Sequence, residues 1–103
     1  MPSITKAKII HCFLFSFNPG VTEDQKEGFF KAAKAIEKIP GIIAVELGPN
    51  IDNPPYEYTG VIYHTDDKTR QVYVTHPTHR YFVENYYRPL TQENRVSCNT
   101  IVE

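Results

Sequence analysis

The stretch Thr75-His76-Pro77-Thr78-His79-Arg80-Tyr81-Phe82 predicts the start of a helix around which the rest of the chain can be placed. Proline suits the first helical position, because its missing N–H needs no partner there and its φ is already helical. His79 then falls in the first turn and shares a face with apolar residues at helical spacing. Those residues are Phe82, Val83, Tyr86 and Leu90. We expect His79 to point into the interior or a pocket; a core-edge histidine bonded to a backbone carbonyl is the plainer alternative.

A long strand is predicted near the start of the chain, from Lys6 to Phe17. One side carries Ile9, His11, Phe13, Phe15 and Phe17, and the other carries Ile10, Cys12, Leu14 and Ser16. Because both sides are largely apolar, this strand is expected to be central and covered on both faces. His11 is the polar exception on the aromatic side.

The remaining pattern predicts three further strands and two helical segments, the second of which consists of a short helix followed directly by the His-Pro helix. A capping box at Thr22 starts a helix that runs to about Ile39, and Asp66-Asp67 caps a short helix to about Thr75. The His-Pro helix follows, to about Gln92. The further strands are expected over residues 41–47, 56–65 and 95–102. This order is the ferredoxin-like split β-α-β layout, a single α+β domain over residues 1–103 with a four-stranded antiparallel sheet and both helical segments on one face.

The other face of that sheet would be bare. It would expose an apolar patch that includes Cys12, Leu14, Val61 and Tyr63, and monomers avoid such patches. A second copy that covers this face is the simplest remedy, so the sequence predicts a homodimer with two-fold symmetry.

Composition narrows the classes of function. A formal charge of −1 over 103 residues gives no electrostatic case for nucleic acid or an anionic membrane. The longest apolar run, Ile9 to Phe17, is far shorter than the roughly 20 residues of a membrane span. It is also a poor signal peptide. Cys12 and Cys98 are expected to be free thiols in a reducing compartment, so the predicted location is the cytoplasm. Seven Tyr and six Phe suggest an aromatic-lined pocket or an interface, although a plain core can also hold them.

Several motifs together resemble the stress-responsive dimeric α+β barrel family. They are an opening strand with a histidine (Ile10-His11-Cys12-Phe13-Leu14-Phe15), the helix exit Ile39-Pro40-Gly41, Tyr58-Thr59, Tyr73-Val74-Thr75-His76-Pro77-Thr78-His79 with Phe82-Val83, and Arg88-Pro89-Leu90. The resemblance covers nearly the whole chain. It implies the ferredoxin-like fold and the dimer more directly than it implies a function, since the family includes heat-stable plant proteins as well as a plant polyketide cyclase.

The resemblance to that cyclase implies a set of site residues. Tyr73 and His79 correspond to its catalytic pair, and His11 and Phe29-Phe30 to residues of its pocket. Three pocket positions differ here, where Gly60, Ala33 and Leu90 replace larger side chains. These replacements imply a wider cavity and a different or bulkier aromatic or polyketide-like ligand, bound without a cofactor.

An aldol ring closure requires a base and an oxyanion donor. Neutral histidine suits the first task and a tyrosine hydroxyl the second, so His79 is the candidate base and Tyr73 the candidate donor. His11 would position the substrate. The expected walls are Phe13, Phe29, Phe30, Ile62 and Phe82.

Other functions remain open on the sequence. One is a non-catalytic ligand-binding or stress-protective dimer, and another is an oxidative enzyme, which the sequence does not separate from a cyclase. A metal site built from His11, His64, His76 or His79 ranks lower, because no cysteine or carboxylate completes a convincing set.

Overall fold

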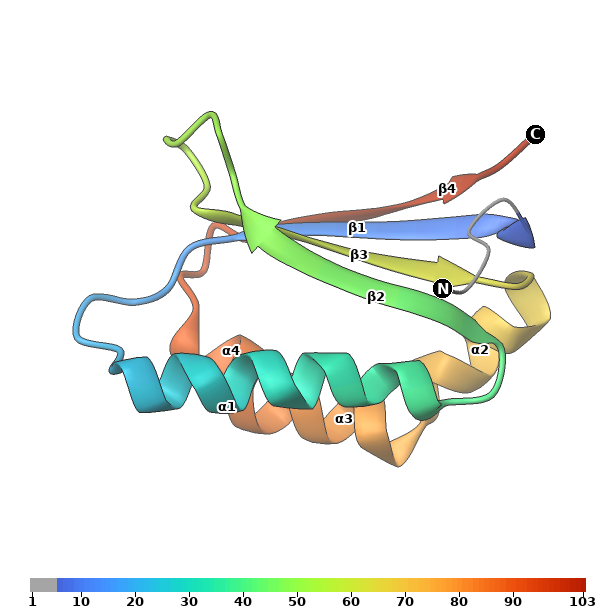
Figure 1. The fold of residues 1–103 in the computed structure, drawn as a ribbon, viewed down its shortest axis with the longest axis horizontal. Coiled ribbons are helices and arrows are strands. Elements are labelled where there is room, and N and C mark those ends of the chain that lie inside the picture. The colour runs from blue at the N-terminus through green and yellow to red at the C-terminus, as the bar shows by residue number, and fades with distance from the viewer. Residues whose placement is uncertain (1–5) are drawn as a thin grey trace.

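The computed structural model describes residues 6–103 and shows a sheet with all helices on one side (Figure 1). Along the chain the elements are β1 (Ile9–Phe15), α1 (Glu23–Lys34), η2 (Ala35–Lys38), β2 (Ile42–Pro49), β3 (Tyr58–His64), α2 (Asp67–Thr75), α3 (Pro77–Phe82), η3 (Val83–Tyr87), α4 (Arg88–Leu90) and β4 (Val96–Ile101). The four strands lie in the order β2-β3-β1-β4, and every neighbouring pair is antiparallel. The predicted ferredoxin-like fold is confirmed.

Several element ends differ from the sequence prediction. Strand β1 ends at Phe15, and Phe17 forms an isolated bridge with Thr91 instead of continuing the strand. Strand β2 continues to Pro49, two residues past the predicted end at Leu47. The last helical segment stops at Leu90, before the predicted Gln92.

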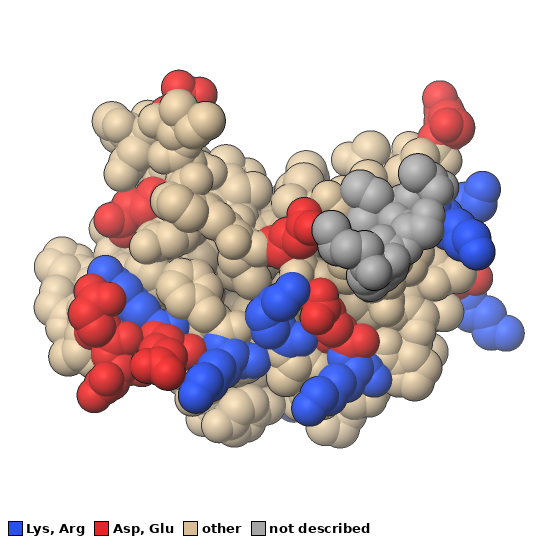
Figure 2. Space-filling view, in the orientation of Figure 1, with Lys and Arg blue, Asp and Glu red and all other residues tan. Residues whose placement is uncertain are grey.

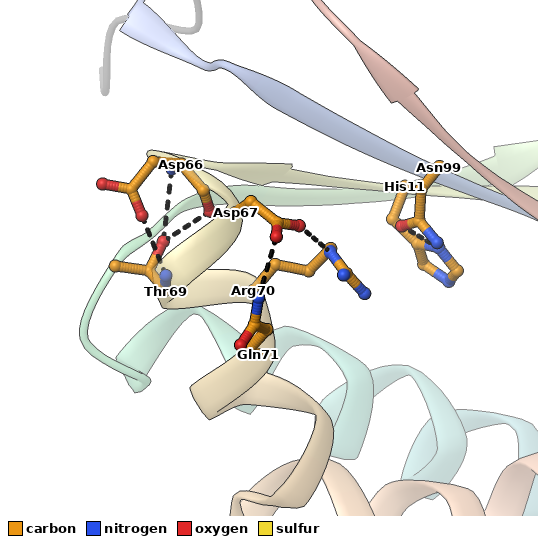
Figure 3. A network of polar contacts seen from close by, with 7 residues as sticks. All are labelled: His11, Asp66, Asp67, Thr69, Arg70, Gln71 and Asn99. Carbon is orange, nitrogen blue, oxygen red and sulfur yellow. Dashed lines mark hydrogen bonds and ion pairs between the residues drawn. The ribbon is translucent and has the colours of Figure 1, made fainter.

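Local side-chain bonds explain where the first two helices begin. Thr22 and Gln25 form the predicted capping box of α1, with the Gln25 N–H donating to the Thr22 hydroxyl. Asp66 caps α2 in the same way through the Thr69 N–H, at 2.8 Å (Figure 3). Both helices therefore start where the sequence predicts.

Aromatic rings fill the core between the sheet and the helices. Phe15 and Phe29 are fully enclosed, and their ring centroids lie 5.1 Å apart. The ring of Phe82 packs against Phe29 at 5.0 Å, which joins α3 to α1. Most of the phenylalanines therefore serve the core.

The face of the sheet away from the helices carries the predicted apolar residues. Cys12, Leu14, Val61 and Tyr63 all point to it and are half-buried. Cys12 lies directly opposite Cys98 in the β1–β4 register, and both are free thiols. Figure 2 shows lysine and acidic side chains gathered along the helical side of the view, while the sheet above them is mainly uncharged. Within residues 6–103, no helix is long and apolar enough to cross a membrane.

Candidate functional site

A cavity of about 410 Å³ lies between the sheet and the helical layer. It is lined by residues from both layers: His11, Phe13, Ile62, Tyr73, His79, Phe82, Val83, Tyr87, Arg88, Arg95, Val96 and Ser97. This size falls within the range of pockets that take small molecules.

Tyr73 and His79 lie side by side in the wall of this cavity. Their ring centroids are 4.0 Å apart, at an interplanar angle of 40°. The sequence Thr75-His76-Pro77 produces this arrangement, because a residue before proline avoids the helical region and His76 is extended at φ −66° and ψ 137°. Helix α2 therefore ends, α3 begins at Pro77, and the chain turns so that His79 returns beside Tyr73.

The backbone fixes the tautomer of His79. Its Nδ1 lies 3.1 Å from the carbonyl oxygen of Val74. A carbonyl oxygen only accepts, so Nδ1 carries the proton and donates, and Nε2 of the neutral ring keeps a free lone pair. Burial lowers the pKa of His79, with His11 adding to the effect and the bond to Val74 opposing it. His79 is thus the carbonyl-bonded histidine of the plainer alternative, with a nitrogen still available as a base.

The Tyr73 hydroxyl stays protonated. Its side chain is only 5% exposed, and burial raises its pKa far above the ordinary value, with Tyr87 adding to the shift. A hydroxyl with a raised pKa is a hydrogen-bond donor at every physiological pH. The pair therefore combines a neutral imidazole with a phenol that can donate.

His11 is held at the edge of the cavity by β4. Its Nδ1 donates to the Asn99 side-chain oxygen at 3.0 Å, and its ring stacks on Phe13 with centroids 5.7 Å apart (Figure 3). Burial lowers the pKa of His11, and Arg70 adds to this, whereas the bond to Asn99 opposes it. The register that places His11 opposite Asn99 explains the contact.

His64 is fully buried beside the same pair. Its ring centroid is 4.9 Å from that of Tyr73, and neither ring nitrogen has a hydrogen-bond partner among the described residues. Burial lowers the pKa of His64 to about 4, and the nearby His11, Arg70 and His79 add to this. From the sequence, His64 was named only as a possible ligand of the low-ranked metal site.

Across residues 6–103, no three His, Cys, Asp or Glu side chains lie close enough together to hold a metal ion. His76 serves α3 instead, because its Nδ1 accepts the N–H of Thr78 at 3.1 Å.

Six of the eleven predicted site residues line the cavity, and five lie elsewhere. Phe29 and Ala33 are fully buried in the core, and Leu90 packs at its margin. Phe30 lines a separate hollow along α1 with Tyr58.

The expectation that Gly60 widens the cavity is wrong. A Cβ at this glycine would lie 2.1 Å from the Phe13 ring, so that ring already fills the space.

The sequence missed Tyr87, Arg88 and Arg95. Helical spacing from Phe82 predicted that Tyr86 would face the core, and Tyr86 does pack against its margin. The spacing did not predict η3, a π-helical turn in which the Arg88 N–H donates to the Val83 carbonyl. The wider turn brings Tyr87 onto the core face, 5.7 Å from Phe82. The sequence feature that could have indicated this turn is Pro89, which has no N–H to continue the hydrogen bonds of a regular α-helix.

The fold and the cavity define a ferredoxin-like α+β domain with a ligand-sized space between the sheet and its helices. The profile of the stress responsive A/B barrel domain, Dabb, matches residues 9–99. The chain belongs to this family. Among curated proteins, none matches the chain at a significant level.

Solved structures share the fold at low sequence identity. A dimeric ferredoxin-like protein of unknown function from Thermobifida fusca YX is 24% identical, over 93% of this chain and 92% of its own, with a TM-score of 0.79. A Dabb family protein from Mesorhizobium loti MAFF303099 is 20% identical, over 94% and 98%, with a TM-score of 0.80. SnoaB, a cofactor-independent oxygenase from Streptomyces nogalater, is 13% identical, over 94% of each chain, with a TM-score of 0.75. At these identities the likeness concerns the fold alone.

Proposed function

We propose that this protein is a cofactor-independent enzyme that closes a ring in a linear poly-β-keto substrate by an aldol step. The observation that carries the proposal is the 4.0 Å separation of the Tyr73 and His79 rings in the cavity wall. One residue of the pair is a base with a free nitrogen, and the other is a protonated donor.

The reaction begins with proton transfer to His79. Its Nε2 takes a proton from a carbon between two carbonyl groups, where the acidity of the C–H bond suits an imidazole base. The resulting enolate carbon attacks a distant carbonyl carbon of the same chain and forms the new C–C bond. The attacked oxygen becomes negative, accepts a hydrogen bond from the Tyr73 hydroxyl, and then takes the proton back from His79.

The cavity contributes mainly orientation. A linear chain must fold so that the two reacting carbons meet. Walls that hold the bound chain in this shape lower the entropic part of the activation barrier. Phe13, Ile62 and Phe82 supply apolar walls from three different elements. His11, fixed by Asn99, would bind a carbonyl oxygen along the chain.

The proposed active assembly is a homodimer formed through the bare face of the sheet. The half-exposed Cys12, Leu14, Val61 and Tyr63 supply the apolar contact area, and the Thermobifida fusca neighbour is described as dimeric. The cavity lies on the opposite, helical side of the sheet.

The first test is the cyclisation of a linear poly-β-keto thioester, followed by chromatography of the products. We expect His79→Ala to lower the rate by about 10²- to 10⁴-fold, the range for a general base. Tyr73→Phe should lower it by about 10²- to 10³-fold, the range for one oxyanion donor. His76→Asn is the matched control, because it changes a nearby histidine that caps α3 and asparagine is also a good cap.

The outcomes separate the candidate functions. Equal rates for wild type and a folded His79→Ala variant would disprove the scheme. If the wild type binds the substrate but forms no product, the non-catalytic ligand-binding dimer is favoured. The fold of each variant is checked by circular dichroism.

A second candidate reaction is an oxygenation, favoured by the structural likeness to a cofactor-independent oxygenase. The same proton transfer to His79 would create a carbanion, and molecular oxygen would then be the co-reactant. Oxygen uptake measured during turnover separates the two reactions, because ring closure consumes no oxygen.

A further inference from the structure

Two arginines lie in the wall of a cavity whose lining contains no described carboxylate. Arg88 and Arg95 line it together with His11 and His79, and no described residue of the lining is Asp or Glu. The chain as a whole carries a formal charge of −1, so this positive cavity does not reflect its overall charge balance. Two guanidinium groups facing one space without a counter-charge are typical of a site for an anion.

Arg95 is held in place by its neighbours. Its Nη1 donates to the Gln92 carbonyl oxygen at 3.1 Å, and its guanidinium carbon lies 5.4 Å from the centre of the Tyr87 ring. A guanidinium has five N–H donors, so most of them remain for a ligand. The cation–π contact with this ring restrains the guanidinium group, which lowers the entropy lost when it binds an anion.

Arg88 is more exposed and has no partner of its own. Among the described residues it makes no hydrogen bond or ion pair through its side chain. The acid one helical turn earlier, Glu84, pairs with Arg80 at 3.3 Å. Arg88 is therefore free to bind an anion that enters the cavity.

The two arginines and the Tyr73–His79 pair come from different elements around the cavity. Arg88 begins α4 and Arg95 precedes β4, whereas Tyr73 lies in α2. Figure 1 shows α2 and α4 at opposite ends of the helical layer, with α3 between them. A ligand that contacts both groups would place one terminus against the arginines and its interior carbons near His79.

We propose that Arg88 and Arg95 form an anion subsite, and that the ligand of this cavity is an elongated molecule with an anionic group at one end. This inference rests on the proposed function, because it takes the cavity as the ligand site. The guanidinium fork binds two oxygens of one anion at once, and both carboxylate and phosphate groups have the required geometry. The anion is either a carboxylate of the ligand itself or a phosphate of a carrier such as coenzyme A.

The test measures the binding of defined probes by tyrosine fluorescence and calorimetry. Salicylate and salicylamide have nearly the same shape and differ in charge, and coenzyme A supplies the phosphate alternative. We expect wild type to bind an anionic probe at least about ten-fold more tightly than salicylamide. This is the gain in affinity expected from one charge-assisted hydrogen bond. Preference for salicylate indicates a carboxylate ligand, and preference for coenzyme A indicates a carrier.

Matched variants assign the effect to the two arginines. Arg88→Gln and Arg95→Gln should each remove most of the preference for the anion, and Arg95→Lys, which keeps the charge without the fork, should restore part of it. Lys38→Gln removes the same charge from an exposed position and should bind as wild type does. Circular dichroism checks that each variant is folded.

Failure of this subsite is distinguishable from failure of the cyclase. Equal binding of salicylate and salicylamide, or no anionic probe bound below about 10 mM, overturns the subsite whatever the fate of the cyclisation assay. Binding that depends on the arginines but survives in His79→Ala supports the subsite even if no ring closure is found.

Discussion

At the scale of single residues, His64 differs from the other histidines because its ring is fully enclosed and unbonded among the described residues. Its pKa in the fold is about 4, against 6.5 when the chain is unfolded. Between these values the unfolded chain binds a proton that the folded chain does not. The contribution of neutral His64 to the free energy of unfolding is therefore fully present above about pH 6.5. It is lost as the pH falls toward 4, and a pKa shift of this size makes the loss roughly 3 kcal/mol.

This loss predicts the behaviour of His64→Leu. The variant has no group to protonate at this position, so its free energy of unfolding should fall less than that of wild type between pH 7 and pH 4.5. Urea unfolding at both pH values measures the difference, and carboxylates that titrate in the same range affect both proteins alike. An equal loss of unfolding free energy in the two proteins would show that His64 is not a buried neutral imidazole.

The site was predictable from sequence where a residue follows from local chain geometry. His79 was expected to face the interior or a pocket because of its place in the first turn after Pro77, whereas its pairing with Tyr73 was implied by the family resemblance. The structure has the helix break at His76 that brings the two rings together. Arg95 was not predictable, because its place depends on how a loop returns to the sheet and on a ring, Tyr87, that the helical period does not bring to the core. The buried position of His64 follows from the alternation that turns Val61 and Tyr63 to the far face, but its missing partners are a tertiary property.

At the scale of elements, the π-turn η3 decides which of two adjacent tyrosines packs on the core phenylalanines. Tyr87 packs against Phe13, Phe15 and Phe82 at ring distances of 5.5 to 5.8 Å. Tyr86 instead meets the backbone of α1 at Gly28, where a Cβ would lie 3.0 Å from its ring. Tyr86 therefore packs at the margin of the core, while Tyr87 contacts the core phenylalanine rings.

We therefore expect Tyr87→Ala to destabilise the protein more than Tyr86→Ala. Loss of a core aromatic costs about 3 to 5 kcal/mol, and Tyr87, as a partly exposed member of the core, should fall at the lower end of that range. Tyr86→Ala should cost about 1 to 2 kcal/mol, as for an average substitution. Thermal and urea unfolding of both variants measure the order, and the reverse order would mean that η3 continues as a regular helix in solution.

At the scale of the whole molecule, the antiparallel register explains why the fold was predictable while several element ends were not. Alternation along β1 and β3 sets which side chains face the helices, and a shift by one residue would turn the whole apolar set outward. Phe13 opposite Gly60 and Ile9 opposite His64 keep that alternation in both strands. Strand ends depend instead on local bridges such as Phe17 with Thr91, which pattern alone does not encode.

The same register leaves the far face of the sheet apolar, which predicts how the molecule assembles. Wild type should sediment at about twice the 11.9 kDa of one chain. Val61→Lys places an unpaired charge in the proposed interface, where burial of the charge costs several kcal/mol, and should yield monomers. Ile51→Lys makes the same chemical change at a loop residue that is 99% exposed, so that variant should stay dimeric. Analytical ultracentrifugation distinguishes these species, and a wild type that stays monomeric at high concentration would show that the far face has another use.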